Sequence, residues 1–574
     1  MLAAIVLVVA GRLVQLQGVS PVALTDKSGV QGVRPVVVPA VRGRILDRNG
    51  NELALSVVAT NVTANPRAIA KAVCQPRVTT PCDAASIARA VAPLLSLDEA
   101  DVRAKLELDK AFVYLKRGMD PAVAQKVLDL DLPGIGSERG TRRVHPSHDL
   151  AAGVLGFTDF DGLGVAGVER SLQSTLAGKD GKTVARFDAF GRVIPTSGDS
   201  QVNPVAGKDV ELTLDQDLQW YAQKLIADQV QATNALNGSV VVMDVKTGEV
   251  LAMATAPAFD LDNRAGVSYL GNPAVSDVYE PGSVNKVITA AAALQDGVVT
   301  PETVVEVPPT YKVSNKVLHD AEAHGLEYLT FAGVLAKSSN IGTVKVAQQL
   351  GPQRIYDMMR KFGFGTKSGL GLPGESRGLI PRPKDWSGTS IANIPIGQGI
   401  SVNVMQVASV YATIANDGVR VQPTIIRSVR DAAGHVTTPA AAPQSRVVSP
   451  EVAASIRVML EQAVSEQGTA PKAAIAGYRV AGKTGTAQRV AVEGPRKGRY
   501  DGTYTSSFIG MAPADAPRFV TAVVLQGTGS KGYFGGQVAA PLFSKITGFA
   551  LRSYGVAPTG TATPVLRLSA DAPR

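Results

Sequence analysis

Three short sequence motifs carry side chains of the types that acyl transfer needs. In the first, Ser283 and Lys286 lie three residues apart, directly after Pro281-Gly282. Residues at this spacing share one face of a helix. A serine hydroxyl is a weak nucleophile, and a lysine can take its proton if burial and the positive helix N-terminus keep the amine neutral. Taken alone, however, a serine after Pro-Gly is more often just a helix cap.

Two further motifs follow the first along the chain. Ser338-Ser339-Asn340 lies in a region of helical runs, and Lys483-Thr484-Gly485-Thr486 comes at the end of a strand pattern. Each is weak on its own, because Ser-x-Asn is ordinary loop composition and Lys-Thr-Gly is a common turn. Their order and separation after Ser283 argue against coincidence. We therefore interpret the three motifs as one site that the fold must assemble.

The elements that would position these motifs form an α+β pattern. Apolar residues at helical spacing predict a buried helix from Ser283 to Gly297. Strand patterns precede it, helical runs dominate between about 300 and 470, and further strand patterns follow, at 210–215, 238–252, 478–482, 505–510 and 519–525. This order predicts an antiparallel sheet flanked by helices and closed by the terminal strands.

The region before residue 207 reads as a separate α+β domain. Asn49-Gly50 between two apolar runs predicts a hairpin, and short helices are expected between about 65 and 135. Arginines beside the hairpin either pair with carboxylates at the base of this domain or are solvated. A polar, turn-rich stretch up to Val205 places the domain boundary near Gly207.

Both ends of the chain differ from these two domains. The apolar run Leu2 to Ala10 has about half of the roughly 20 residues that a bilayer span needs. We interpret residues 1–16 as the outer half of an uncleaved membrane anchor whose cytoplasmic start is missing. A Pro/Thr/Ala-rich composition predicts that residues 554–574 are a disordered tail.

The composition of the chain limits the kinds of partner and cofactor that we expect. The net charge of +9 and pI near 9.3 favour acidic surroundings such as an anionic membrane or cell wall, and no nucleic-acid-binding module is visible. The five histidines show no ligand spacing, so neither a metal nor another cofactor is expected. The two cysteines, Cys74 and Cys82, are either a local disulfide or two free thiols.

The three motifs together resemble those of the penicillin-binding proteins and serine β-lactamases. The serine in the middle of Ser338-Ser339-Asn340 is similar to the penicillin-binding proteins rather than to class A β-lactamases. Segments between about residues 10 and 550 also look like class B penicillin-binding proteins, including Arg42 to Gly50, Gly167-Val168-Glu169, Leu212 to Asp215 and Gly397-Gln398-Gly399. The division-type (FtsI-like) enzymes of high-GC Gram-positive bacteria look most similar, with the elongation-type paralogue as the alternative.

This resemblance implies a domain organisation and a reaction. Residues 207–553 would form a transpeptidase domain of the penicillin-binding, serine β-lactamase-like fold, and residues 17–206 an elongated pedestal of the dimerisation type. The enzyme would cross-link peptidoglycan stem peptides through a serine acyl-enzyme during septal wall synthesis. β-Lactams, which mimic the D-Ala-D-Ala end, would acylate the same serine.

The resemblance also implies residue roles. Ser283 would be the nucleophile, Lys286 its general base and Ser338 a proton relay to the leaving amine. Asn340 would hold the peptide amide of the substrate, and Lys483 would supply positive charge. The remaining residues would bind the terminal carboxylate and form the oxyanion hole, namely Thr484, Gly485 and Thr486 for binding and the backbone N–H groups of Ser283 and Thr486 for the oxyanion.

Partners and location follow from the same resemblance. The protein would be a single-pass protein of the cell membrane with most of the chain outside the cytoplasm. The region before about residue 205 lacks room for a glycosyltransferase domain, so an FtsW-type polymerase and other divisome membrane proteins would be its partners. A hydrolase (a carboxypeptidase or a β-lactamase) and a non-enzymatic β-lactam sensor or scaffold remain the alternatives to a transpeptidase.

Overall fold

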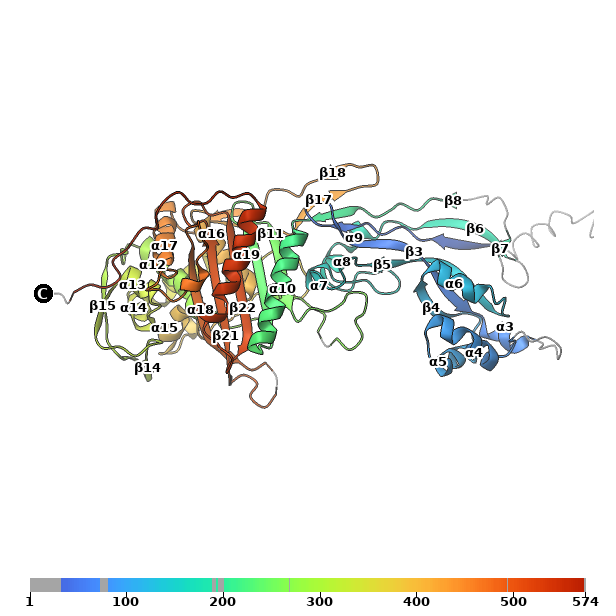
Figure 1. Cartoon of the computed structure of the whole chain (residues 1–574), viewed down its shortest axis with the longest axis horizontal. Coiled ribbons are helices and arrows are strands. Elements are labelled where there is room, and N and C mark those ends of the chain that lie inside the picture. The colour runs from blue at the N-terminus through green and yellow to red at the C-terminus, as the bar shows by residue number, and fades with distance from the viewer. Residues whose placement is uncertain are drawn as a thin grey trace, which may run out of the picture.

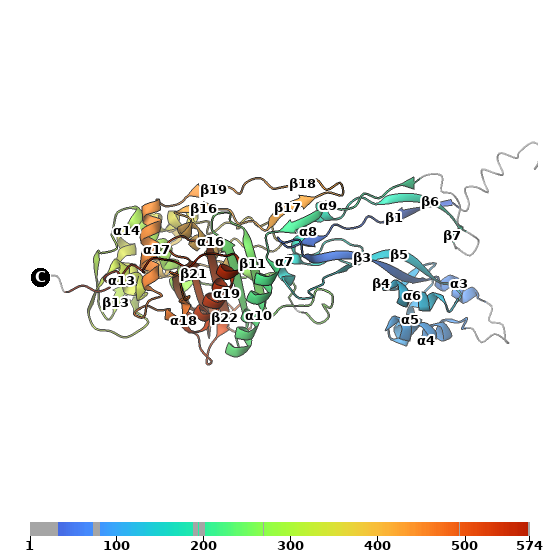
Figure 2. The ribbon, with the colours of Figure 1, turned by 45° about the horizontal axis from the view of Figure 1, so that its top comes forward.

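The computed structural model describes residues 33–72, 81–187, 193–194, 201–267, 269–492 and 494–571. A large domain of sheet and helices occupies one end of an elongated molecule, and a slender pedestal of long strands extends from it (Figure 1; Figure 2). The predicted anchor and Cys74 lie outside the described residues, so the anchor and the Cys74–Cys82 bridge stay predictions. Within the described ranges, no helix has both the length and the apolar character that crossing a bilayer requires.

A five-stranded antiparallel sheet forms the centre of the large domain. The strands lie in the order β11-β10-β22-β21-β20, so two strands that precede Ser283 pair with three from the end of the chain. Their bounds are Asn237–Asp244 for β10, Val250–Ala256 for β11, Ala481–Val490 for β20, Tyr500–Ala512 for β21 and Phe519–Thr528 for β22. The predicted α+β sheet, closed by terminal strands, is confirmed.

Helices cover both faces of this sheet. On one face lie α10 (Gln216–Thr233) and α19 (Ala540–Ser553) (Figure 1), and on the other α16 (Val404–Ala415). The core on the α16 side also contains α12 (Lys286–Gln295), which packs against α14 and α17. Alternate residues of β10 therefore enter two different hydrophobic cores, Val240 and Val242 with α10 and Val241 and Met243 with α16. Because both faces are buried, the strand is apolar without interruption rather than alternating.

The segment between α12 and α16 builds the far end of the domain. It contains two small antiparallel pairs, β12 with β15 and β13 with β14, followed by helices. The bounds are Val304–Val307 for β12, Tyr311–Val313 for β13, Lys316–Leu318 for β14, Glu327–Thr330 for β15, Phe331–Ala336 for α13, Asn340–Lys361 for α14 and Ser390–Asn393 for α15. After α16 come β16 (Val419–Val421), β19 (Gln444–Arg446) and α17 (Pro450–Gln462), and α17 packs against α13.

The pedestal is built on the long strand β3 (Glu52–Ala64). It pairs with β2 (Ile45–Leu46), β4 (Val113–Met119) and β5 (Ile135–Val144), and the β2–β3 turn is the predicted Asn49-Gly50 hairpin. Four helices with a separate apolar core lie beside β4, namely α3 (Pro66–Lys71), α4 (Ala84–Leu95), α5 (Glu99–Leu106) and α6 (Pro121–Leu128). A second sheet joins β1 (Val33–Val38) to β6 (Gly181–Phe187), with β7 (Val193–Ile194) and β8 (Gln201–Val202) on β6.

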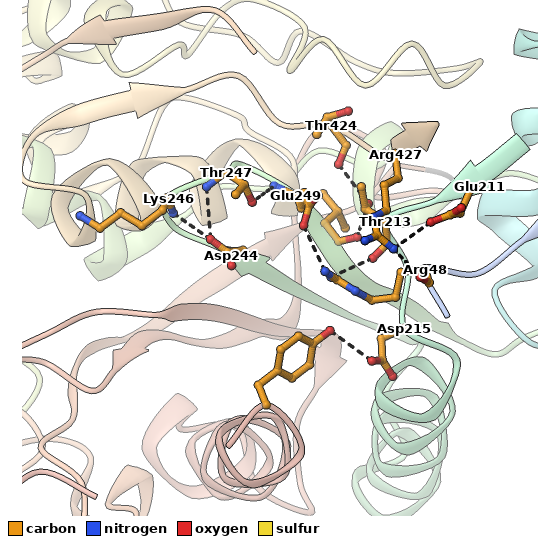
Figure 3. Close-up of polar contacts among 12 residues, drawn as sticks. Arg48, Glu211, Thr213, Asp215, Asp244, Lys246, Thr247, Glu249, Thr424 and Arg427 are labelled. Atoms are coloured by element: carbon orange, nitrogen blue, oxygen red, sulfur yellow. Dashed lines mark hydrogen bonds and ion pairs between the residues drawn. The ribbon is translucent and has the colours of Figure 1, made fainter. Parts of the chain in front are cut away.

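The two parts share a sheet where they meet. Strand β9 (Asp209–Leu212) runs parallel to β2 and pairs on its other side with β17 (Ile426–Arg430), which is followed by β18 (Val436–Thr437). Figure 3 shows the ion pairs at this joint: Arg48 lies 3.4 Å from Glu249, and Arg427 lies 2.8 Å from Glu211. Beside the hairpin, Arg42, Arg44 and Arg48 thus each pair with a carboxylate, and Arg44 is also half in solvent.

A buried cluster of charges lies where three pedestal segments converge. The carboxylate of Glu169, in α8 (Gly167–Ser171), accepts hydrogen bonds from Arg42 at 2.6 Å and from Arg143 at 2.7 Å. The Glu169 side chain is fully buried and both guanidiniums nearly so. Two short helices complete this region, α7 (Ala152–Leu155) and α9 (Gln173–Leu176). We refer to Arg42, Arg143 and Glu169 as the pedestal ion cluster.

Two predictions differ from the structure. Strand β20 begins at Ala481 and runs through Lys483 to Thr486, so the third motif lies inside a strand instead of ending one. The predicted disordered tail is wrong for residues 554–571, which return across the large domain and bury Leu568 in its core. The Pro/Thr/Ala-rich composition misled the prediction, because backbone hydrogen bonds and a few apolar side chains hold this segment.

Candidate active site

Ser283 sits in a tightly held turn. It belongs to the single 3₁₀ turn η2 (Gly282–Asn285), which leads directly into α12. Val284, Asn285 and Lys286 are buried, and Ser283 alone among these neighbours is partly exposed. Its hydroxyl makes no hydrogen bond to another described residue, so it is the side chain of this turn that a substrate can reach.

Buried polar groups fix the position of the turn. The amide nitrogen of Asn285 donates to the carbonyl oxygen of Ile394 at 2.8 Å, and the hydroxyl of the buried Tyr411 donates to the carbonyl oxygen of Val284 at 3.0 Å. The backbone N–H of Gly282 donates to the carbonyl oxygen of Gly397 at 3.0 Å. Buried hydrogen bonds of this kind specify one geometry, because breaking any of them leaves a costly unpaired polar group.

Lys286 connects the first motif to the second. Its side chain is 1% exposed, and Nζ lies 2.8 Å from Oδ1 of Asn340 and 2.5 Å from the carbonyl oxygen of Ser338. A third neighbour is the hydroxyl of Ser338, at 3.2 Å. Burial lowers the pKa of Lys286 to about 7, although the negative charge of Asp320 opposes this shift. A large fraction of the amine is therefore neutral at physiological pH and able to accept a proton.

The second motif is held by an aspartate that the sequence reading missed. Asp320 accepts hydrogen bonds from the Ser339 hydroxyl at 2.6 Å and from the backbone N–H groups of Asn340 and Ile341 at 2.5 and 3.0 Å. These N–H groups begin α14, where a carboxylate is favoured. No spacing rule connects Asp320 to residues 19 to 21 positions later; only the fold brings them together.

The second motif also has strained backbone. Ser338 has a φ of 61°, in the left-handed region that a serine rarely adopts. This conformation places both its carbonyl oxygen and its hydroxyl within reach of Nζ of Lys286. The side chain of Asn340 is fixed at both ends, because its nitrogen donates to the carbonyl oxygen of His319 at 2.9 Å while its oxygen accepts from Lys286.

The third motif lies against the first because β20 passes directly beside η2. At Gly485 a Cβ atom would lie 2.3 Å from Oγ of Ser507 and 3.0 Å from the carbonyl oxygen of Pro281, so only glycine allows this approach. As the edge strand of the sheet, β20 leaves one side of its backbone without a partner strand. An extended substrate can pair with such an edge.

Lys483 is the second buried amine of the site. Its side chain is fully buried, and burial together with the nearby charge of Lys286 holds its pKa well below the usual lysine value. Its only side-chain partner among the described residues is the hydroxyl of Thr484, at 3.4 Å. Thr484 in turn donates to Thr469 at 2.9 Å, whereas Thr486 is partly exposed and accepts from the N–H of Gly535 at 3.2 Å.

Further residues around the turn were not singled out in the sequence. Glu280 accepts from the N–H of Gly399 at 2.8 Å and from the hydroxyl of Tyr500 at 3.0 Å, while Lys316 donates to Gln398 at 3.1 Å. Burial and the charge of Glu280 raise the pKa of Tyr500 to about 12. These contacts connect the Ser283 turn to the β20–β21 hairpin and to β14.

A hollow of about 410 Å³ lies close to the third motif. It is bordered by Gly502, Tyr504, Gly529, Ser530, Gly532, Tyr533, Phe534 and Gln537. Tyr504 and Tyr533 stack with ring centroids 4.3 Å apart. The N–H of Gly535, next to Phe534, reaches Thr486, so an apolar substrate group bound along β20 would meet this aromatic wall.

One group with metal-ligand geometry occurs among the described residues, although the sequence predicted none. His148, Asp260 and Asp262 place one ligand atom each within 4.8 Å of one another. Asp262 already accepts a hydrogen bond from the buried His145, at 2.8 Å. These residues connect the pedestal to the loop after β11, away from the three motifs, and no step of the chemistry requires them.

Comparison with known families covers both parts of the chain. Residues 238–548 match the family described as the penicillin-binding protein transpeptidase domain, and residues 37–212 match the penicillin-binding protein dimerisation domain. The first range falls within the predicted domain at 207–553, and the second lies in the predicted domain at 17–206 except for its last residues, 207–212. The exact domain boundaries stay predictions.

Individual proteins agree with this match. The chain is 40% identical to penicillin-binding protein PbpB of Mycolicibacterium smegmatis, over 99% of this chain and 91% of that protein. It is 35% identical to peptidoglycan D,D-transpeptidase FtsI of Escherichia coli K12, over 96% and 90%. The structure of penicillin-binding protein 3 of Mycobacterium tuberculosis complexed with ampicillin aligns with a TM-score of 0.72 at 36% identity, over 93% of this chain and 100% of that one.

Proposed function

The chain belongs to the class B penicillin-binding proteins, in which a dimerisation domain precedes a transpeptidase domain, and from this premise we propose how its site works. It is a division-type peptidoglycan D,D-transpeptidase that acts through a serine acyl-enzyme. One observation carries the mechanism: the buried amine of Lys286, three residues after Ser283, is held by Ser338 and Asn340 with a pKa of about 7.

In the first half-reaction, Ser283 attacks the carbonyl carbon between the two D-alanines of a stem peptide. Lys286 takes the hydroxyl proton as Oγ bonds to carbon, and the C–N bond then breaks. The proton passes through the Ser338 hydroxyl, 3.2 Å from Nζ, to the nitrogen of the departing D-alanine. The products are an ester on Ser283 and a free amino acid, so no proton is gained or lost.

In the second half-reaction, the amine of a neighbouring stem peptide attacks the ester. One of its protons returns through the same groups to Oγ of Ser283, which leaves as the new amide forms. The acceptor amine approaches the site and must be neutral when it attacks. Lys286 and Lys483 have lowered pKa values, so they add little positive charge that would repel an acceptor before it has lost its proton.

Substrate binding falls to the second and third motifs. The fixed amide of Asn340 offers hydrogen-bonding groups to the peptide, and the edge strand β20 pairs with it through Gly485 and its neighbours. Thr484 and Thr486 bind the terminal carboxylate, with Lys483 supplying charge when it is protonated. The N–H groups of Ser283 and Thr486 stabilise the oxyanion, and one such donor contributes about 3 kcal/mol in comparable sites.

Mass spectrometry of the intact protein tests the proposal directly. Incubation with a penicillin should add the mass of one opened β-lactam to the wild type, with the adduct mapped to the peptide that contains Ser283. Ser283→Ala should show no adduct while retaining its unfolding transition. An adduct on another residue, or an unlabelled wild type, would contradict the assignment and favour a sensor or scaffold without acyl transfer.

A second assay separates transfer from hydrolysis. A stem peptide ending in D-Ala-D-Ala is incubated with a D-amino acid acceptor, and products are separated by chromatography. Exchange of the terminal residue is expected for a transpeptidase, whereas free D-alanine alone would indicate a carboxypeptidase.

Partners and location form a separate part of the proposal. We infer a single membrane anchor at residues 1–16, an extracytoplasmic body, and an FtsW-type polymerase with other divisome membrane proteins as partners. Support comes from the division-type relatives and from the apolar run at Leu2 to Ala10. In cell fractionation, the full chain should sediment with membranes and a chain lacking residues 1–16 should not; co-purification from detergent extracts tests the polymerase.

A further inference from the structure

The C-terminal end of the chain returns to the part of the domain that carries the second motif. After α19 the chain is held first at Val556, whose carbonyl oxygen accepts from Tyr478 at 2.6 Å, and then at Thr559, whose N–H donates to Gly477 at 2.8 Å. It then crosses α17 and reaches β15 and α13. Residues 564–570 are called the C-terminal segment below.

A buried glutamine on α17 holds the beginning of this segment. The side-chain nitrogen of Gln462 donates to the carbonyl oxygen of Pro564 at 2.7 Å, and its oxygen accepts from the N–H of Leu566 at 3.4 Å. Gln462 is 5% exposed. Both ends of a buried amide thus bind the backbone of the C-terminal segment. Loss of the segment would remove both hydrogen bonds and leave the nitrogen only its 3.3 Å contact with the carbonyl oxygen of Val458.

The segment then extends the small sheet at β15. The N–H of Thr330 donates to the carbonyl oxygen of Leu568 at 3.1 Å, and the N–H of Ala570 donates to the carbonyl oxygen of Tyr328 at 2.8 Å. Leu329 and Ser569 face each other in antiparallel register. The side chain of Leu568 enters the large core and is 8% exposed. The segment is therefore packed as a short added strand.

Contact with α13 is direct and involves backbone on both sides. The hydroxyl of Thr330, the N-cap of α13, donates to the carbonyl oxygen of Arg567 at 2.6 Å and accepts from the N–H of Gly333 at 3.0 Å. A Cβ atom at Gly333 would lie 1.9 Å from the carbonyl oxygen of Leu568. The glycine is thus the residue that lets the C-terminal segment lie against the helix.

Helix α13 in turn fixes the second motif. The N–H of Ser339 donates to the carbonyl oxygen of Val334 at 2.9 Å, and the N–H of Ser338 donates to that of Leu335 at 3.3 Å. These two hydrogen bonds hold the left-handed backbone of Ser338, whose carbonyl oxygen accepts a hydrogen bond from Lys286. Only α13 (Phe331–Ala336) and its C-cap Lys337 separate the contact at Thr330 from Ser338.

We propose that the C-terminal segment positions the Ser338–Asn340 motif through α13, with Leu568 and Thr330 as positioning residues. The segment touches no substrate. It sets the distance between Lys286 and its acceptors by seating the helix that carries them. This inference rests on the acyl transfer at Ser283 proposed above, because its readout is the rate of that reaction.

The test compares four proteins by their second-order rate of acylation by a fluorescent penicillin. They are the wild type, a chain ending at Gly560, Gly333→Ala, and both changes combined. The shortened chain and Gly333→Ala should each acylate at least tenfold more slowly, and the combination no more slowly than the shortened chain. Gly560→Ala is the matched control, because its Cβ meets nothing within 4 Å and the rate should be unchanged.

The shortened chain that also carries Gly333→Ala shows whether the slower acylation of Gly333→Ala acts through the C-terminal segment. If Gly333→Ala slows the shortened chain as much as it slows the full one, its effect does not run through the C-terminal segment and the proposal is overturned. Gly333→Ala and Thr330→Val leave the whole chain in place, so they test the contact even where the shortened chain fails to fold. Thr330→Ser keeps the hydroxyl and should restore the wild-type rate.

The pH profile distinguishes positioning from stabilisation. The charge of Asp320 raises the pKa of Lys286, the charge of Lys286 lowers that of Lys483, and none of these variants removes any of the three groups. A displaced motif admits water to Lys286, so the midpoint of acylation should move above its wild-type pH. A lower melting temperature with unchanged rate and midpoint would reduce the segment to a stabilising role and overturn the proposal. A wild type that is not acylated would overturn the proposed function, and this inference with it.

Discussion

Two clusters of buried cations in this molecule have opposite designs. In the pedestal ion cluster, Arg42 and Arg143 share the carboxylate of Glu169 at 2.6 and 2.7 Å. In the active site, Lys286 and Lys483 are as deeply buried, but their near neighbours are amide, carbonyl and hydroxyl oxygens. Asp320 acts on Lys286 only through space and is occupied by Ser339 and the start of α14.

The difference shows how burial yields structure in one place and reactivity in the other. A guanidinium keeps its proton and takes part in fixed, directional pairs, so burial with a carboxylate makes a rigid joint. An ammonium that lacks a paired carboxylate can lose its proton, and burial then lowers its pKa. The pKa of Lys286 falls to about 7 for this reason. Burial also lowers the pKa of Arg143, and its partner Glu169 opposes that shift, but a guanidinium starts from so high a value that it stays protonated.

The largest expected effect comes from removing the buried amine of Lys286 in the active site. Lys286→Ala should slow acylation by penicillin about 10²–10⁴-fold, because the general base is lost. Lys286→Arg should be nearly as slow, since a guanidinium does not give up its proton. Stopped-flow measurement with a fluorescent penicillin checks both, and the exposed Lys224→Ala is the control. An active Lys286→Arg would mean that the lysine supplies charge and not basicity.

Breaking the pedestal side should affect stability and leave the chemistry intact. Glu169→Gln leaves two buried guanidiniums without a counter-charge and should lower the free energy of unfolding by about 3–5 kcal/mol. Chemical denaturation followed by a pedestal probe measures this loss. At low denaturant the acylation rate should stay within about twofold of wild type. A parallel loss of acylation would mean that the two clusters are coupled.

The pH dependence sharpens the contrast. Acylation requires neutral Lys286, so its rate should rise with pH through a midpoint near 7. The same group affects stability: between about pH 7 and its ordinary pKa of 10.5 the unfolded chain binds more protons than the folded one, so the free energy of unfolding increases with pH. The slope from this group is at most about 1.4 kcal/mol per pH unit.

Comparison with Lys286→Met isolates this contribution. The variant lacks the titrating amine, so its unfolding free energy minus that of the wild type should decrease as pH rises from 7 to 10. Denaturation curves at three pH values suffice. A difference that is independent of pH would show that Lys286 titrates alike in the folded and unfolded states.

The smallest effect is expected where a cation of the same kind is exposed. Arg44 lies 3.1 Å from Glu52, with about half of its side chain in solvent. Glu52→Ala should change the unfolding free energy by only about 0–1 kcal/mol, because solvent already screens the pair. A loss comparable to that of Glu169→Gln would show that burial does not explain the strength of the pedestal cluster.

The sequence predicted the sheet and the main helices well, because their signals are local. Helical spacing after Ser283, the Asn49-Gly50 turn and the apolar strands at 238–252 and 519–525 all correspond to observed elements. The C-terminal segment could not be predicted in this way. Its order comes from Gln462, Thr330 and the Gly333 contact, and none of these is near it in the chain.

The residues of the candidate site also divide into those with a local sequence signal and those that only the fold brings together. The three motifs were recognisable because their residue types and order are unusual in combination, and the fold places Lys286 against the second motif. Asp320, Glu280 and the aromatic wall at Tyr504 and Tyr533 carry no such local pattern. They act through contacts made by residues that are distant in sequence.

The amino-acid sequence by itself determined which groups are present for chemistry: two serines, two lysines and an asparagine in short motifs on predictable elements. Only the tertiary structure decided the protonation state of these groups. It removed water from Lys286 and Lys483 without giving them a paired carboxylate, and it gave Arg42 and Arg143 a carboxylate to share. Protonation depends on solvent and charge in three dimensions, and a linear pattern contains neither.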